Sequence, residues 1–269
     1  MSTGFHVVVC GSLVPDLLQT LEPVQGPAGP GLRNELMLPS VLDPWAAHAL
    51  YEAGHLAATV PGTRVWLVSL GPKAKLQQLM MSIAQKVPFE FVAIDASASG
   101  FTDPVEVAAA LADAIEMIPA LDRSRLLLFG GCASASRDAG VTVQLVGERL
   151  GIADQFLAVD ELTVSAQGTL TILERVEGGK YLVSEVAGPP CAIAWATGNR
   201  PEPPNNPQIG MLNMRTIMPA LQKARLVQLS APGTTFHGVE LPKQERRTRI
   251  VKDVPIEEMA MEIANWIKE

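Results

Sequence analysis

The sequence predicts an α/β protein with a doubly wound, mainly parallel sheet, a Rossmann-like fold. Short apolar runs of strand length alternate with segments of helix length as far as Gly151. These runs are apolar almost throughout, as expected for strands that are buried on both faces of a parallel sheet. After Gly151 the pattern changes to short strand-like runs. It predicts a small β-hairpin addition, followed by a C-terminal arm that ends in a helix.

The alternating part of the chain accounts for four strands and four helices. Two of the helices begin with an Asp-Pro pair, at Asp43 and at Asp103, where the aspartate caps the helix and the proline suits its first turn. Gly151 is placed to stop the fourth helix. The predicted strands cover residues 6–10, 65–70, 89–94 and 126–129, and the predicted helices cover residues 43–57, 73–85, 103–117 and 138–150.

The second part of the chain is expected to be richer in strands and loops. Glu177-Gly178-Gly179 reads as a hairpin turn. Residues 199–208 hold four prolines and three asparagines, which predicts an ordered loop or a crossing arm. Strands are predicted at residues 162–164, 169–175, 181–186, 191–196 and 226–229, helices at 211–224 and 255–268, and irregular chain at 231–243.

This pattern divides the chain into two expected parts. Residues 1–230 form the α/β nucleotide-binding domain, with a hairpin region near residues 160–190. Residues 231–269 form the arm, and its amphipathic helix is expected to dock on the chain's own domain or on a neighbour.

Composition and charge exclude several classes of protein. The formal net charge of −7 argues against binding to a nucleic-acid backbone. No apolar stretch reaches about 18 residues, so no membrane span is expected. There is no secretory signal pattern, and three scattered cysteines indicate reduced thiols in a cytoplasmic protein. A hydrophobic content of 48% favours a permanent subunit interface slightly over a merely apolar core.

The junction at residues 126–151 is the strongest local signal for a ligand. A strand feeds a small-residue loop that opens a helix, so backbone N–H groups are offered to an anion such as a nucleotide phosphate. Gly130 and Gly131 are expected to let the backbone approach that ligand, although many α/β proteins cross from strand to helix in this way without binding one. Ser134 and Ser136 have no base nearby in sequence, and Cys132 is interpreted as a structural thiol.

Sequence motifs for catalysis are missing. The four histidines are scattered, and no His, Cys or acidic grouping has the spacing of a metal site. The chain has no nucleophile elbow, no P-loop and no dinucleotide-binding glycine fingerprint. These absences count against a self-sufficient enzyme.

Seven blocks of sequence together resemble the beta subunit of electron-transfer flavoprotein. They include VVVCGSLVPD, DPWAAHALYEA and VSLGP, then the 126–151 junction, ERVEGGKYLV and RTIMPALQKARL. They follow one another in register over nearly the whole chain, at residues 7–16, 43–53, 68–72, 126–151, 174–183, 190–194 and 215–226.

The resemblance implies an electron carrier and not an enzyme. Such a subunit pairs with an alpha subunit that carries most of the FAD site, shields one side of the flavin, and commonly holds AMP, or a second FAD in bifurcating members, in its own pocket. For this chain AMP, FAD and an empty pocket all stay open. The assembly takes electrons from a flavin-dependent dehydrogenase and passes them to a downstream acceptor. The alternative is a stand-alone adenine-nucleotide-binding protein, either a hydrolase or ligase of adenylates or a nucleotide sensor.

The resemblance also assigns site residues. Residues 14–17 would approach the flavin held by the partner, and the other positions would form the nucleotide pocket. The cofactor-binding set is Cys10, Val14, Pro15, Asp16, Leu17, Asp43, Ser69, Leu70, Gly71, Gly130, Gly131, Cys132, Ala133, Ser134, Ser136, Arg137, Asp138, Ala139, Gly140 and Val141. A partner-recognition segment near residues 205–225 would grip the dehydrogenase through Leu212, Met214, Ile217 and Met218, although packing into the chain's own core is an equally good reading of Met214.

The chain departs from the family pattern at several of these positions. Ala135, Ser136 and Arg137 stand where the family usually has consecutive aspartates, and Gly140 and Val141 replace a Gln-Thr pair. Fewer side chains are therefore expected to bond ribose and phosphate, so backbone N–H groups and Arg137 would hold an anion instead. The base-then-acid order near the hairpin is also reversed, which predicts a rewired ion pair between domains.

Overall fold

The computed structural model describes residues 4–26, 29–97, 102–136, 140–229, 237–240, 248 and 250–268. The chain divides into two compact units, Met1–Val239 and Glu240–Glu269. Of the region predicted to be irregular, residues 231–236 and 241–243 lie outside the described residues.

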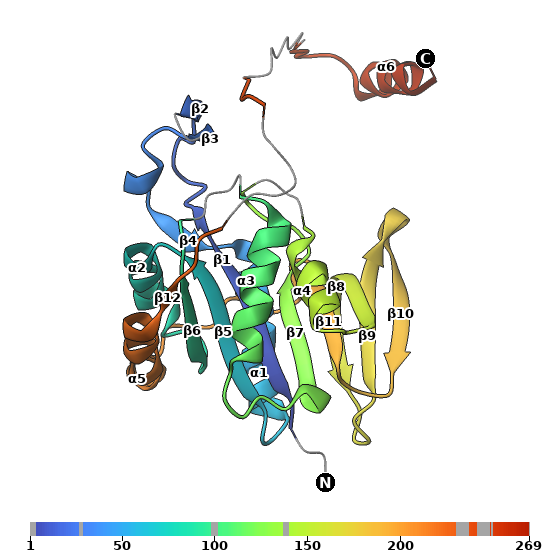
Figure 1. Ribbon diagram of the computed structural model, residues 1–269. Coiled ribbons are helices and arrows are strands. Elements are labelled where there is room, and N and C mark those ends of the chain that lie inside the picture. Colours follow the sequence, from blue (N-terminus) through green and yellow to red (C-terminus); the bar gives the residue numbers. More distant parts are fainter. Residues whose placement is uncertain are drawn as a thin grey trace. The chain divides into compact units, whose positions relative to one another are not determined.

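The first unit is built on a mixed sheet whose centre is parallel (Figure 1). Its strands lie in the order β10-β9-β8-β11-β7-β1-β5-β6-β12, and β4 pairs with β1 off this path. The parallel strands that carry the core are β1 (His6–Pro15), β5 (Arg64–Gly71), β6 (Glu90–Asp95), β7 (Leu126–Gly131) and β11 (Cys191–Trp195). Each of these five strands contains a strand predicted from the sequence or overlaps one.

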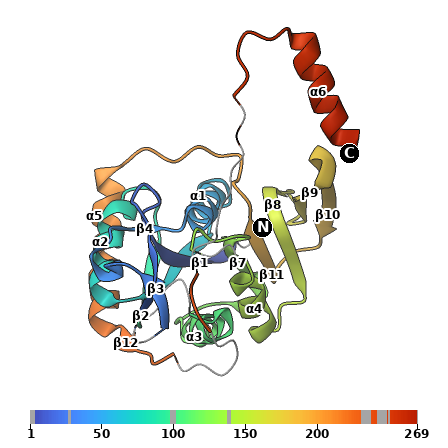
Figure 2. The same cartoon turned by 90° about the horizontal axis from the view of Figure 1, so that it is seen from above.

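Helices cover both faces of this sheet, as expected for a doubly wound fold. Val7 and Val9 of β1 pack into one apolar cluster, while Val8 and Cys10 pack into another on the opposite face. The first face is covered by α1 (Pro44–Thr59), α2 (Lys73–Ile83) and α5 (Pro207–Lys223), and the second by α3 (Pro104–Glu116) and α4 (Thr142–Arg149). Figure 2 shows α1 on one side of β1 and β7, and α3 and α4 on the other.

The two Asp-Pro helix starts are confirmed. Asp43 Oδ1 accepts from Trp45 N at 3.1 Å, and Asp103 Oδ1 accepts from Val105 N at 2.8 Å. The predicted start of α4 at residue 138 is wrong, because the helix begins at Thr142. Gly140 has a φ of +60°, which is incompatible with a helical turn at that position.

Residues 17–42 contain structure that was not predicted. β2 (Pro23–Gly26) and β3 (Gly29–Leu32) form a hairpin, a short 3-10 turn follows at Glu35–Met37, and β4 (Ser40–Leu42) returns beside β1. β2 and β3 are short and rich in proline and glycine, and β4 has only three residues, so they lack the apolar alternation that marks a strand in the sequence. In Figure 1 the hairpin stands at the end of the sheet where β1 ends.

An antiparallel extension continues the sheet beyond β11. β8 (Asp154–Val164), β9 (Leu170–Val176) and β10 (Lys180–Val186) form it, and the turn at Glu177–Gly179 joins β9 to β10 as predicted. β8 is much longer than the predicted strand, because its first half pairs in parallel with β11 and its second half pairs antiparallel with β9. At the other edge, β12 is confined to Arg225–Leu226 and is shorter than expected.

The proline-rich crossing arm and the terminal helix are both present. Asn206 N donates to Gln85 O at 2.9 Å, and Arg200 Nε donates to Glu52 Oε2 at 2.9 Å, so the arm is held against the first unit. In the second unit, α6 (Ile256–Lys268) confirms the predicted helix. None of the helices in the described ranges is long and apolar enough to span a membrane.

Candidate functional site: a cavity at the carboxyl ends of the parallel strands

A cavity of about 910 Å³ lies where the central parallel strands end. After β1 the chain turns to α1 on one face of the sheet, and after β7 it turns to α4 on the other face. Such a switch point leaves a crevice outside the carboxyl ends of the strands, which is where doubly wound proteins bind ligands. Its volume is at the upper end of the range of about 300–1,000 Å³ that is typical of small-molecule sites.

One wall of the cavity is the small-residue loop after β7. Gly131, Ala133, Ser134 and Ser136 line the cavity. The loop is organised by its own polar groups, since Ser136 N donates to Ser134 Oγ at 3.2 Å and the two hydroxyl oxygens lie 2.8 Å apart. The wall therefore offers hydroxyl and backbone groups and no cation among its described residues.

The carboxylate of Asp43 joins this loop to the start of α1. Its Oδ2 accepts from Ser134 Oγ at 2.9 Å and from Ala135 N at 2.9 Å. Burial raises the pKa of Asp43, and the hydrogen bonds from Ala135, Ser134 and Trp45 oppose that rise. Ser134 is thus engaged in positioning the loop, through a carboxylate that lies far from it in the sequence.

Gly130 and Gly131 both allow close packing, a role that the sequence interpretation did not include. A Cβ atom on Gly130 would lie 2.3 Å from Val143 Cγ2, and one on Gly131 would lie 2.5 Å from Trp45 Cβ. These glycines allow α4 and α1 to approach the end of β7. Gly130 lies outside the cavity lining, whereas Gly131 forms part of it.

Gly140 and the start of α4 form the next part of the wall. A Cβ on Gly140 would lie 2.1 Å from the carbonyl oxygen of Cys132, and the φ of +60° favours glycine at this position. The N-cap residue Val141 makes no side-chain hydrogen bond to the helix. Thr142 and Val143 line the cavity, so the first N–H groups of α4 lie beside it.

The remaining wall comes from segments that the sequence did not single out. Lys75 of α2 donates from Nζ to the carbonyl oxygen of Glu35 at 2.8 Å, which ties the 3-10 turn to the main body. Leu36 and Met37 of that turn line the cavity, yet they are 83% and 85% exposed. The Gly-Pro run before this turn was the one sequence feature that could have indicated this part of the wall. Unpredicted lining residues include Gly11, Ser12, Gly29, Pro30, Lys75, Ser97, Thr102, Pro104, Val107, Leu111 and Thr142.

Most of the predicted nucleotide-pocket residues meet at this cavity. Cys10 lines it, and burial raises the pKa of its thiol to about 12, so this cysteine is a small neutral wall residue. The predicted residues that line the cavity are Cys10, Val14, Pro15, Asp43, Leu70, Gly71, Gly131, Ala133, Ser134, Ser136 and Gly140. Those outside the lining are Asp16, Leu17, Ser69, Gly130, Cys132 and Val141, while Arg137, Asp138 and Ala139 lie outside the described residues.

The predicted partner-recognition residues lie on α5 with different exposures. Leu212 is 52% exposed and Met218 is 39% exposed, whereas Ile217 is 1% exposed and packs in the core. Met214 is half-buried against the same core. Met211, which the sequence interpretation did not single out, is 67% exposed and lies beside Leu212 in the sequence.

The reversed Glu174-Arg175 pair makes contacts within the chain. Arg175 donates from Nε and Nη2 to the two carboxylate oxygens of Asp160, at 2.9 and 2.8 Å, and Tyr181 OH donates to the same carboxylate at 3.1 Å. Asp160 is buried at the register shift of β8. Glu174 accepts from Leu157 N at 2.8 Å. Both charged groups therefore stabilise the antiparallel extension itself.

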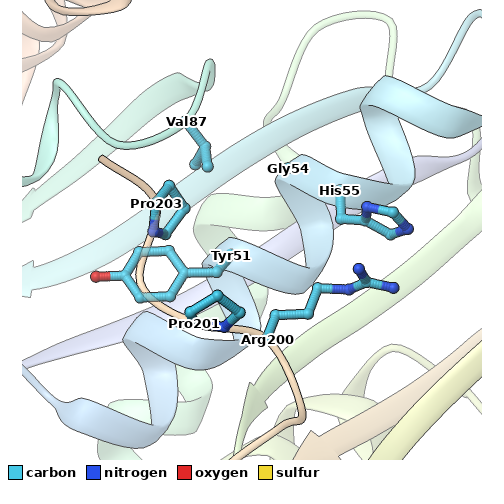
Figure 3. Close-up of a pocket in the computed structure, with 7 residues that line it drawn as sticks. All are labelled: Tyr51, Gly54, His55, Val87, Arg200, Pro201 and Pro203. Atoms are coloured by element: carbon cyan, nitrogen blue, oxygen red, sulfur yellow. The ribbon is translucent and has the colours of Figure 1, made fainter. Parts of the chain in front are cut away.

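A second, shallower depression of about 320 Å³ lies between α1 and the crossing arm (Figure 3). Tyr51 and His55 project from α1, and Arg200, Pro201 and Pro203 come from the arm. Arg200 is already paired with Glu52. Within the described residues no group of three or more His, Cys, Asp or Glu side chains could hold a metal ion.

Comparison with known proteins identifies the family. The family model for the electron transfer flavoprotein domain matches residues 34–224. The chain belongs to the electron transfer flavoprotein family. Its members are electron carriers that generally bind flavin and typically work with partner subunits and dehydrogenases. A search of the curated proteins found no match.

Proposed function

We propose that this chain is the beta-type subunit of an electron transfer flavoprotein. It pairs with an alpha subunit that binds most of the FAD, and it holds an adenine nucleotide in its own cavity. The assembly takes electrons from a flavin-dependent dehydrogenase in the cytoplasm and delivers them to an acceptor. The observation that supports this most strongly is the cavity at the switch point, lined by two-thirds of the predicted pocket residues that the structure describes and enclosed largely by the matched family domain.

The residues of the cavity fit an adenine nucleotide. The start of α4 offers backbone N–H groups and the loop after β7 offers the Ser136 hydroxyl, which suit phosphate and ribose oxygens. Val107, Leu111 and Val143 offer apolar surface for a base. Both AMP and a second FAD meet this description, so both remain candidates for the pocket.

The end of β1 is the segment that would approach the shared flavin. Val14 is buried in the cavity wall, and Leu17 and Leu18 beyond it are 52% and 91% exposed. When bound, FAD supplies the ring that accepts and releases electrons. In this proposal the exposed leucines cover one side of that ring and exclude water from it.

Two exposed apolar surfaces are available for the protein partners. On α5, Met211, Leu212 and Met218 form an exposed surface for the dehydrogenase, in which Met211 takes the place first expected for the buried Ile217. On α6, Ile263 and Trp266 are 53% and 63% exposed, as expected for a helix that docks on the alpha subunit.

Co-production of the full chain with an alpha subunit tests the proposal. The purified complex is expected to be yellow and to contain FAD together with AMP or a second FAD in equal proportion to the beta-type chain. The control is the chain produced alone, which is expected to be colourless. Stoichiometric FAD on a monomeric lone chain, or turnover of ATP by that chain, would contradict the proposal and favour the stand-alone nucleotide-binding alternative.

A further inference from the structure

Asp43 combines a helix cap with a long-range connection. Its own N–H donates to Ser12 O at 2.9 Å, which fixes it beside the end of β1. Its Oδ1 accepts from Trp45 N of α1, and its Oδ2 accepts from Ser134 Oγ and Ala135 N of the loop after β7. One side chain, 2% exposed, therefore connects the start of α1 to the loop after β7.

The second Asp-Pro start makes the same capping bond. Asp103 accepts from Val105 N and begins α3 with the same Asp-Pro sequence. Capping alone thus accounts for the Oδ1 bond of Asp43 and leaves its Oδ2 contacts to be explained. Those contacts reach a residue 91 positions away, in the loop whose Ser134 and Ser136 line the cavity.

The loop depends on this carboxylate for its shape. Ala135 N and Ser134 Oγ share the same acceptor oxygen, and Ser134 Oγ in turn accepts from Ser136 N. Removing the acceptor would leave the Ala135 N–H without its partner and free the Ser134 side chain to rotate. Both serines would then lose the positions in which they line the cavity.

We propose that Asp43 is a positioning residue of the nucleotide site: its carboxylate ties the Ser134–Ser136 loop to α1 and does not itself hold the nucleotide. This inference rests on the proposed function, because it assigns the cavity to a nucleotide. It replaces the direct ligand contact that the resemblance gave to Asp43. The carboxylate oxygens and the loop groups that bond them are engaged within the chain, which leaves the Ser136 hydroxyl and the first N–H groups of α4 for the ligand.

The substitution Asp43→Asn keeps the bond that caps α1 and removes the bond from Ala135 N of the loop. An asparagine keeps an acceptor oxygen for Trp45 N, whereas its amide nitrogen cannot accept from Ala135 N. The matched control is Asp122→Asn, which makes the same chemical change at the cap of the 3-10 turn Arg123–Arg125, at the amino ends of the strands, where Asp122 Oδ1 accepts from Ser124 N at 3.0 Å. The substitution Ser134→Ala is the second variant, because it removes one loop bond and leaves the cap of α1 untouched.

Two measurements are made on each full-length variant. Amide hydrogen exchange of residues 134–136 without ligand reports the loop, and titration with AMP reports affinity. For Asp43→Asn we expect exchange to rise and affinity to fall, each by about tenfold, which corresponds to about 1.4 kcal/mol. We expect a smaller change of the same sign for Ser134→Ala and no change for Asp122→Asn.

The outcomes separate the inference from the proposed function. Loss of affinity with unchanged exchange overturns the inference, because it makes Asp43 a direct ligand contact. Faster exchange with unchanged affinity overturns it as well, because the loop position would not matter for binding. If the unmodified chain binds neither AMP nor FAD, alone or with its alpha partner, then the proposed function fails first and the inference falls with it.

Discussion

The two ends of the parallel strands are built differently. At the amino ends, polar groups meet partners within the chain: Asp122 N donates to His6 Nδ1 at 2.8 Å, and Arg64 pairs with Glu90 while lying 4.5 Å from the ring centroid of Trp66. At the carboxyl ends the strands open into the cavity of about 910 Å³. The difference teaches that one end of the sheet is filled for stability, and the other is left open for a ligand.

Asn213 is part of the filled end. Its side chain is 1% exposed and bonds three backbone groups before β6: Ala84 O and Val87 O at 2.7 Å each, and Phe89 N at 3.0 Å. Every donor and acceptor that these bonds use is buried, so the loop before β6 depends on this one amide.

The largest expected effect is that of Asn213→Ala. It leaves three buried backbone groups unpaired, so the free energy of unfolding should fall by about 3 kcal/mol. Urea denaturation measures the loss, and titration with AMP or FAD should give unchanged affinity when the variant is folded. A variant that loses affinity but keeps its stability would contradict the assignment of stability to the amino ends of the strands and of ligand binding to their carboxyl ends.

The next effect in size is that of Gly140→Ala at the open end. The new Cβ would meet Cys132 O and the residue would be forced to a φ of +60°, so the loop must shift. We expect nucleotide affinity to fall by at least about tenfold, with about 1–2 kcal/mol of stability lost. Affinity is measured by titration and stability by urea denaturation.

Gly178→Ala is the matched control for that variant. Gly178 also has a positive φ, of +73°, but no atom lies within 4 Å of its Cβ position. The control should lose about 1 kcal/mol of stability from backbone strain alone and keep its affinity for the nucleotide. Equal losses of affinity in both variants would show that strain anywhere in the chain, and not the cavity wall, controls binding.

The smallest expected effect is the dependence of stability on pH at the filled end. Burial, together with the charges of Arg125 and Arg64, lowers the pKa of His6 from 6.5, against the opposite influence of Asp122 and Glu90. The folded state therefore binds fewer protons than the unfolded state just below pH 6.5. Stability from this group is present above that pH and is lost as the pH falls through the window.

His6→Asn isolates this contribution. Urea denaturation between pH 7.5 and about 5 should show a shallower loss of stability in the variant than in the unmodified chain. His48 and His55 have pKa values lowered by burial in the same direction, so part of the slope should remain. An identical slope in both proteins would contradict the role given to His6.

Local signals in the sequence predicted most of the fold, and non-local contacts account for what they missed. The Asp-Pro starts of α1 and α3 were predictable because a cap needs only residues within one turn. The start of α4 was not, because it depends on the approach of Gly140 to Cys132 O. The β2–β3 hairpin was missed because glycine and proline are uncommon inside strands, so short strands that contain them are not recognised from the sequence.

The sequence predicted where the site lies, but not how its side chains are connected. The junction after β7 pointed to the carboxyl end of the sheet, and its serines do line the cavity. The bond between Asp43 and Ser134 joins residues 91 positions apart, so no local pattern reveals it. The roles of Gly130 and Ile217 depend on packing against Val143 and the core, which only the folded chain shows.

Photolabelling tests the central claim, that the open end of the sheet holds an adenine nucleotide, most directly. The full chain with its alpha partner is irradiated with an azido derivative of AMP, and the labelled peptides are mapped by mass spectrometry. We predict labels within the cavity wall, at residues 10–15, 70–72, 133–136 or 142–143, that disappear when excess AMP is added. Labels confined to the depression of Tyr51, His55 and Arg200, or labels that excess AMP does not displace, would contradict the account.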